Sequence, residues 1–156
     1  MIVGLIATQI ATTIGYFLPA IGLPSLPWPL YSGILDAPAT KYGTAGSFMA
    51  GELVHMLNGV AFVFLFAILV YSKLPFGRGA VGNLLRALTF GLALTVISAG
   101  VLVPLVYAKG QGYGFFSFTG PDGWKLPLGI LLWHLVYAVH IAALYSGSPG
   151  MNVGRV

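Results

Sequence analysis

The sequence predicts an all-α protein, a four-helix transmembrane bundle whose helices run alternately up and down. Three observations lead to this fold class: 58% of the 156 residues are hydrophobic, only 6% are charged, and the mean hydropathy is +0.93. Soluble domains carry about 25% charged residues, so a water-soluble fold of this composition would lack a polar surface. We expect one transmembrane domain over residues 1–156.

Four apolar segments are long enough to cross a bilayer, which requires roughly 20 residues of α-helix. They predict helices at about residues 2–22, 45–71, 84–106 and 126–145. The connections are a proline- and aromatic-rich segment at 23–44, a short basic segment at 72–83 and a glycine-rich segment at 108–125. None of them has room for a soluble domain, so we expect the helices to pack in one bundle.

The first segment begins without a positively charged region, so we expect a retained helix rather than a cleaved signal peptide. Ala7, Ala11 and Gly15 recur along it at four-residue intervals and form a face of small residues. Gly91 belongs to a similar face on the third segment. Such faces let membrane helices approach closely, so they predict helix packing, either within the chain or against another subunit.

The ends of the predicted helices carry residues typical of the membrane interface. Pro104 is expected to kink or end the third helix near the outer surface. Trp28 and Trp124 fall in the two outer connections, where tryptophan commonly anchors at the level of the lipid headgroups. The glycine-rich run at 109–116 follows no strand and lacks the lysine and serine of a P-loop, so it predicts an interfacial loop rather than a phosphate site.

The distribution of lysine and arginine predicts the orientation. With four crossings both termini lie on one side, and the basic residues of that side are Lys73, Arg78, Arg86 and Arg155. The basic residues of the other side are Lys41, Lys109 and Lys125. The excess places both termini in the cytoplasm of a bacterial inner membrane. The net charge of +4 is spread singly over segment ends, which favours lipid headgroups over nucleic acid as partners.

A polar stripe interrupts the second apolar segment. Glu52, His55 and Asn58 stand three residues apart, so at helical spacing they fall within about one side of the helix and are expected to point together into the bundle interior. Ionisable groups at membrane depth are rare and need partners. The stripe is therefore the best candidate site in the chain.

His134 in the fourth segment is the expected partner of this stripe. The second and fourth helices run parallel, and at 1.5 Å per residue His55 and His134 reach depths of roughly 15 and 12 Å from the outer surface. The two histidines could therefore face each other. His140 lies about 240° further round the fourth helix, so it is not expected to join both in one small site.

Three interpretations of this constellation remain open. Glu52, His55, Asn58 and His134 can form a hydrogen-bonded cluster that fixes helix register. They can instead hold a ligand, with His55 and His134 as axial ligands of a b-type haem or with Glu52 as a third ligand of a metal ion. In the third interpretation they form a proton relay that His140 continues. The absence of cysteine excludes a disulfide framework, Cys-ligated zinc, iron–sulfur centres and covalently attached haem.

The chain also resembles a family, on short motifs that span most of its length. In order, these motifs are Tyr16-x-x-Pro19-x-x-Gly22-x-Pro24, His55-x-x-x-Gly59, Arg86-Ala87-x-x-x-Gly91, Pro104 and His134-x-x-Tyr137-Ala138. They are similar to those of an uncharacterised family of small bacterial four-helix integral membrane proteins with no established activity. The resemblance implies the four-helix fold and implies nothing about chemistry.

These observations predict an accessory or structural subunit of a larger membrane complex, respiratory or otherwise redox-active, whose partners are other integral membrane subunits and lipids. The chain shows no nucleophile constellation and no nucleotide motif, so we expect no intrinsic catalytic activity and, under this interpretation, no cofactor. The alternative is a small membrane protein that binds b-type haem or a metal ion through His55 and His134. A proton or small-solute carrier is the third possibility.

Overall fold

The computed structural model describes residues 1–36, 44–77 and 79–145, and in this part of the chain it consists of helices and turns. Four helical spans are long and apolar enough to cross a membrane: Ile2–Ile21, Ala45–Tyr71, Ala80–Tyr107 and Lys125–Leu144. The all-α prediction with four membrane-spanning helices is therefore confirmed, and the composition of the spans indicates a multi-pass membrane protein. Lys41, Arg78 and Arg155, which entered the orientation prediction, lie outside the described residues.

Each span is divided into segments of different helical type. The first consists of α1 (Ile2–Phe17) and the 3₁₀ turn η1 (Leu18–Ile21). The second consists of α3 (Ala45–Leu65) and η3 (Phe66–Tyr71), and the third of α4 (Ala80–Ile97) and η4 (Ser98–Tyr107), where η3 and η4 are π-helical. The fourth is α5 (Lys125–Leu144). Two further elements lie in the connections, α2 (Trp28–Asp36) and η5 (Phe115–Ser117).

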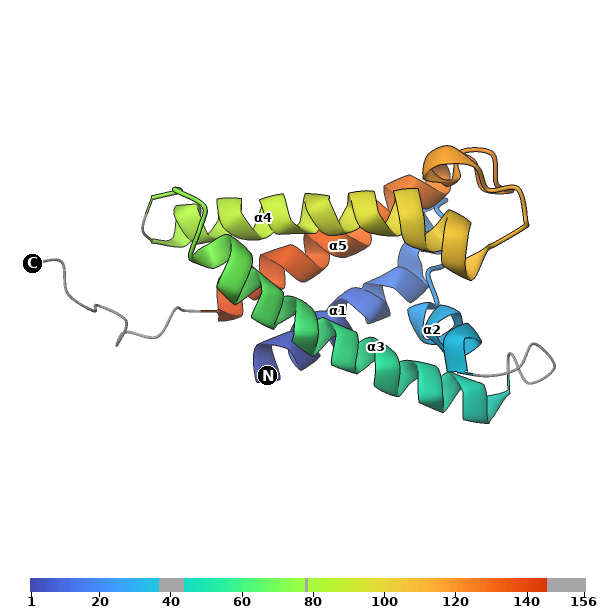
Figure 1. Ribbon diagram of the computed structural model, residues 1–156, viewed down its shortest axis with the longest axis horizontal. Helices are drawn as coiled ribbons and strands as arrows, with labels where there is room; N and C mark the ends of the chain where they lie inside the picture. The colour runs from blue at the N-terminus through green and yellow to red at the C-terminus, as the bar shows by residue number, and fades with distance from the viewer. Residues whose placement is uncertain (37–43, 78, 146–156) are drawn as a thin grey trace, which may run out of the picture.

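Figure 1 shows how the spans are arranged. Following the colours along the chain, α1, α3, α4 and α5 run in alternating directions, and α5 lies between α1 and α4. The spans of α3 and α4 meet at the short hairpin and diverge toward the opposite end of the molecule. There α2 lies between α3 and the outer part of the bundle, so it fills the opening of a V.

The prediction that residues 23–44 form only a connection was wrong, because the described part of this segment contains α2. Pro27 accepts the first backbone hydrogen bonds of this helix, from Leu30 and Tyr31. The helix packs closely on α3, since a Cβ atom on Gly51 would overlap the carbonyl oxygen of Pro29, and one on Gly33 would overlap that of Ser47. Proline in a first helical turn is compatible with a helix, so the proline-rich composition concealed this element.

Pro104 neither ends nor visibly breaks the third span, which continues through it to Tyr107. The π-helical segment Ser98–Tyr107 contains the proline, and wider turns of this kind can accommodate a residue that has no backbone N–H. The same span begins at Ala80, four residues before the predicted start at 84. The third helix is therefore longer than the apolar pattern predicted.

The small-residue faces pack within this chain. Ala7, Ala11, Gly15 and Gly91 are all buried. Gly15 lies against the Trp133 ring of α5, and a Cβ atom on Gly91 would come within 2.9 Å of the His134 carbonyl oxygen. These four predicted packing residues thus contact neighbouring helices of the bundle and leave no small-residue face of their own for another subunit.

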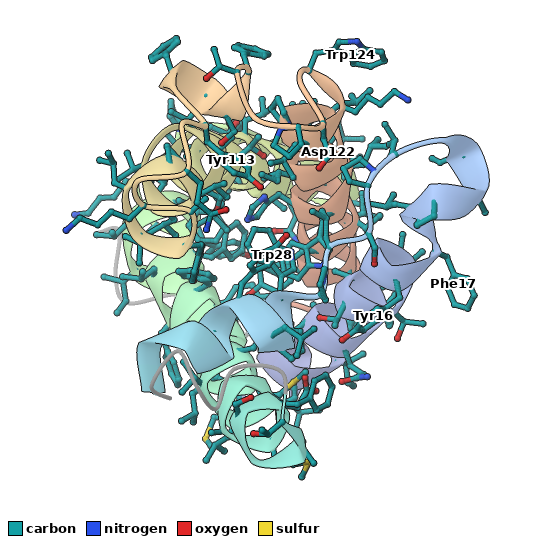
Figure 2. All side chains as sticks on the ribbon, turned by 90° about the vertical axis from the view of Figure 1, so that its right-hand side faces the viewer. Tyr16, Phe17, Trp28, Tyr113, Asp122 and Trp124 are labelled. Atoms are coloured by element: carbon teal, nitrogen blue, oxygen red, sulfur yellow. The ribbon has the colours of Figure 1, made fainter. Side chains whose placement is uncertain are left out.

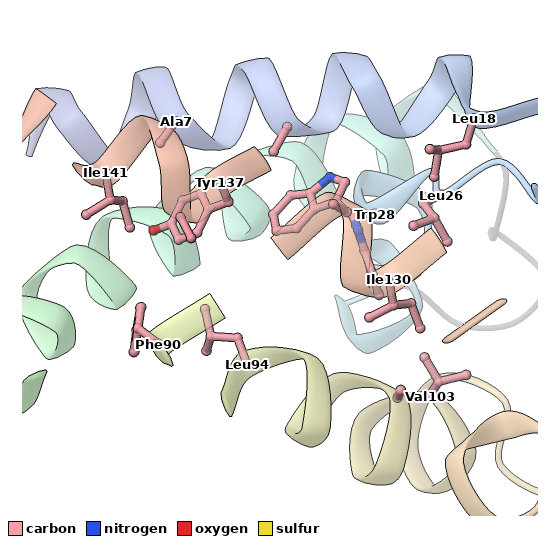
Figure 3. Packing of buried hydrophobic residues seen from close by; sticks show 14 of the residues in the cluster. Ala7, Leu18, Leu26, Trp28, Phe90, Leu94, Val103, Ile130, Tyr137 and Ile141 are labelled. Carbon is pink, nitrogen blue, oxygen red and sulfur yellow. The ribbon is translucent and has the colours of Figure 1, made fainter. Parts of the chain in front are cut away.

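The core follows α5 along the length of the bundle (Figure 3). Tyr137 and Ile141 are fully buried and lie between Ala7 of α1 and Phe90 of α4. Tyr137 also donates a hydrogen bond of 2.6 Å to the carbonyl oxygen of Gly59 on α3. Through one side chain α5 is therefore connected to α1 by packing and to α3 by a hydrogen bond.

Polar side chains satisfy backbone groups at the end of the bundle that carries the α3–α4 hairpin. The guanidinium of Arg86 donates to the carbonyl oxygens of Leu74, Phe76 and Gly77. Asn83 donates to the carbonyl oxygen of Ala142 at 2.7 Å, and also to that of Tyr145. Carbonyls at helix ends lack intrahelical partners, so Arg86 and Asn83 stabilise the hairpin and the end of α5.

The packing of α2 on α3 predicts a position-specific effect of a single methyl group. Gly51→Ala should destabilise the protein by about 1–3 kcal/mol, because the new Cβ atom forces the two helices apart. The thermal unfolding midpoint in mild detergent measures the effect. Gly46→Ala is the matched control on the same helix, since its Cβ atom meets only Thr44 at 4.0 Å. Equal midpoints for the two variants would contradict the close packing.

Candidate functional site

A cavity of about 60 Å³ lies between four helical elements at the wide end of the V. Its polar lining comes from Ser32 of α2, His55 and Asn58 of α3, Ser98 of η4 and His134 of α5. The remaining lining residues are Trp28, Phe62, Leu102, Tyr107 and Trp133. Because polar groups inside a membrane bundle are costly, this concentration of them marks the cavity as the candidate site.

His55 is buried, with 7% of its surface exposed, and its Nε2 atom lies 2.8 Å from the hydroxyl oxygen of Thr12 on α1. This hydrogen bond joins the second span to the first. No other described residue forms a hydrogen bond with the ring, so Nδ1 has no partner among them. His55 therefore has one nitrogen committed to holding helices together and one not engaged by the described residues.

His134 has a defined tautomer. Its Nδ1 atom lies 2.9 Å from the carbonyl oxygen of Ile130, which can only accept, so Nδ1 carries the proton and donates. In the neutral ring Nε2 is then an acceptor, and Ser98 can donate to it across 3.4 Å. A backbone carbonyl that orients an imidazole in this way leaves the opposite nitrogen available to a ligand.

Trp133 connects the two imidazoles. Its ring centroid lies 5.6 Å from that of His55 and 5.0 Å from that of His134. It also stacks on Tyr137 at 5.7 Å with an interplanar angle of 15°. The structure thus brings His55 and His134 to one cavity, as their similar depths predicted, with aromatic rings packed around them.

The polar stripe of α3 does not point together into the interior. Only His55 is buried, whereas Glu52 is half-buried and Asn58 is exposed. Residues three positions before and after His55 project about 60° to either side of it, so Glu52 and Asn58 diverge. Asn58 lines the cavity, whereas Glu52 does not. The expected common direction was wrong for this reason.

His140 does not belong to the cavity. Its Nδ1 atom donates to the carbonyl oxygen of Val136 on its own helix at 2.8 Å. The predicted separation of His140 from the two other histidines agrees with this position. The structure shows no chain of hydrogen bonds from the cavity to His140 among the described residues, so the relay stays a prediction without structural support.

Trp28 was assigned to the membrane interface by sequence and is instead a buried residue of the site. It is 6% exposed and contacts Trp133 at 6.0 Å and Tyr107 at 6.1 Å between ring centroids. Figure 2 shows Trp28 at the centre of the bundle, whereas Trp124 lies at its edge. The position of Trp28 depends on α2, so the error about the connection produced the error about the tryptophan.

Thr12 and Ser98 are site residues that the sequence pattern alone did not indicate as candidates. Both are buried, and each lies within hydrogen-bonding distance of a histidine Nε2 atom. Their spacing gave the useful signal, because Thr12 follows Thr8 on the inward face of the first span. Threonine and serine are small enough for close helix packing, and their hydroxyl groups also make them hydrogen-bond partners.

The size and composition of the cavity limit what it can hold. Cofactor and ligand pockets typically enclose 300–1,000 Å³, so a cavity of about 60 Å³ does not fit a haem macrocycle. Among the described residues, no group of three or more His, Asp or Glu side chains comes together as a metal site. Glu52 in particular does not line the cavity beside the two histidines. The arrangement fits hydrogen-bonded water or a small polar group better than either cofactor.

No family model, curated protein or solved structure matches this chain.

The contact between Thr12 and His55 predicts a difference between adjacent threonines. Thr12→Val should destabilise the protein by about 1–3 kcal/mol, because the buried Nε2 atom of His55 loses its partner while the shape of residue 12 is kept. Thr13→Val is the control, since exposed Thr13 bonds only to the Gln9 carbonyl oxygen of its own helix. Detergent unfolding curves of the two variants compare them directly. A Thr13→Val variant as unstable as Thr12→Val would argue against a structural role for the contact.

Proposed function

We propose that this protein is a non-catalytic subunit of a larger assembly of integral membrane proteins. The observation that carries the proposal is Glu52, an ionisable side chain that lies within a membrane span and is only half-buried by the chain itself. No described residue forms a hydrogen bond or an ion pair with its carboxylate. A neighbouring helix with a donor or a cation at this depth would satisfy it.

The depth of Glu52 in the membrane makes an unpartnered carboxylate there unfavourable. The span Ala45–Tyr71 has 27 residues and is therefore about 40 Å long, longer than the hydrocarbon core of about 30 Å. Centred in the bilayer, the span places Glu52 about 5 Å inside the hydrocarbon. A carboxylate at the centre of a membrane helix costs about 2.5–3.5 kcal/mol on insertion scales, and a somewhat smaller cost applies near the boundary.

The surface around Glu52 is suited to contact with another helix. The second span is the most apolar of the four and the least covered by the rest of the chain. In its most apolar 18-residue stretch 22% of the residues are buried, against 39% to 50% in the other spans. Leu53, beside Glu52, is 62% exposed. A partner helix here would bury apolar side chains around one polar interaction, which is the usual composition of helix contacts in membranes.

The setting proposed for this subunit is a respiratory or other redox complex of a bacterial inner membrane, with both termini in the cytoplasm. The excess of Lys and Arg on the side of the termini supports their placement in the cytoplasm. Support for a role without catalysis comes from the cavity, where the histidines hold helices together through Thr12 and Ser98.

Site-specific crosslinking in native membranes tests the proposal. A photoreactive amino acid at Leu53 should give a discrete adduct with another integral membrane protein, because this position adjoins Glu52 on the uncovered face. The same amino acid at Leu92, which is 51% exposed on α4, is the matched control and should give only lipid adducts.

Glu52→Leu should reduce the Leu53 adduct at least severalfold, because the polar interaction that fixes the partner is removed. Mass spectrometry of the crosslinked band identifies the partner. An adduct made only of two copies of this chain would contradict an accessory role in a larger complex. Equal labelling from Leu53 and Leu92, unaffected by Glu52→Leu, would contradict a specific interface.

A further inference from the structure

Asn58 occupies an unusual place at the mouth of the cavity. It is the central residue of the span Ala45–Tyr71, with thirteen residues to either end, and yet it is exposed. It lines the cavity beside Phe62 and Leu102, which are both half-buried. The cavity therefore reaches the surface between the second and third spans at mid-membrane depth. An occupant that enters past Asn58 comes from the hydrocarbon of the bilayer.

The lining offers more hydrogen-bonding capacity than the protein uses. The indole Nε1 of Trp28 is buried and has no hydrogen-bond partner, although Trp28 is 6% exposed and lines the cavity. Asn58 forms no hydrogen bond with a described residue, and Nε2 of His134 has only the long contact of 3.4 Å with Ser98. Buried polar groups are normally satisfied, so these unused donors and acceptors indicate a missing polar partner.

The charge of the lining indicates a neutral partner. No Lys, Arg, Asp or Glu is among the residues that line the cavity. A carboxylate or phosphate placed there would lose its hydration without gaining a counter-ion, which is strongly unfavourable. A hydroxyl group, by contrast, can accept from Trp28 or Asn58 and donate to the Nε2 lone pair of His134.

The volume limits how much of a molecule enters. About 60 Å³ accommodates roughly four waters, since each needs about 10–15 Å³ of such space. A cavity of about 150 Å³ is known to hold benzene, so a whole ring is too large. A terminal CH₂OH group fits, and the chain attached to it would extend past Asn58 into the bilayer.

We propose that this cavity binds the hydroxyl end of a neutral, chain-bearing molecule dissolved in the membrane. Asn58 holds the polar end at the mouth, Trp28 and His134 complete its hydrogen bonds inside, and the aromatic rings of the lining cover it. This proposal does not depend on the proposed subunit contact around Glu52 and Leu53, because Glu52 does not line the cavity.

Tryptophan fluorescence tests the assignment on the full-length protein in detergent or nanodiscs. The chain has three tryptophans, of which Trp28 and Trp133 line the cavity, so Trp124→Phe confines the signal to the site. The probes are a dodecanol brominated a few carbons from its hydroxyl group and the equally brominated dodecane without the hydroxyl. Bromine quenches nearby indoles, so both probes report where they lie.

Quenching of the tryptophan fluorescence by the alcohol should saturate as its concentration rises. The alkane should quench only weakly, in proportion to its concentration. Asn58→Leu should weaken the affinity for the alcohol about three- to tenfold, which is the effect of one hydrogen bond. The control Leu57→Ala on the exposed face should leave this affinity unchanged. His134→Phe should weaken it as well. Equal, unsaturable quenching by the two probes would overturn the proposal. Saturable quenching that survives Asn58→Leu in a folded variant would also overturn it.

Discussion

The junction of three helices at Gly59 is the contact on which the rest of the bundle depends. Tyr137 of α5 donates to the Gly59 carbonyl oxygen, while the Thr8 side chain and Gly4 of α1 lie against the same turn of α3. The contact is possible only because residue 59 has no side chain, since a Cβ atom there would overlap the Thr8 hydroxyl. In a membrane, where lipid is as apolar as leucine, close backbone approach and interhelical hydrogen bonds are what align helices.

This junction fixes the register of the residues that form the cavity. His55 lies one helical turn from Gly59 on α3, and Trp133 lies one turn from Tyr137 on α5, so the two side chains meet at 5.6 Å. Thr12 lies one turn from Thr8 on α1 and reaches His55 in the same layer. The histidines are therefore neighbours because a glycine contact one turn away aligns three helices.

Polar groups in this protein serve two different purposes. Groups with partners, such as buried Thr12 with His55 and half-buried Asn83 with the end of α5, satisfy the requirement that a membrane interior imposes on donors and acceptors. Trp28 and Asn58 lack such partners, and Glu52 faces away from the cavity. The proposed ligand supplies partners for Trp28 and Asn58. The proposed subunit contact supplies one for Glu52, at a separate surface of α3.

The sequence by itself determined the four spans, their small-residue faces and the similar depth of His55 and His134, because hydropathy, spacing and depth are properties of segments that lipid constrains one at a time. It did not determine α2, the burial of Trp28 or the divergence of Glu52 from Asn58. These features depend on how the second and third spans splay and on which element fills the space between them. Only the tertiary structure decides that, because close contacts such as Gly51 with Pro29 join residues that no local pattern connects.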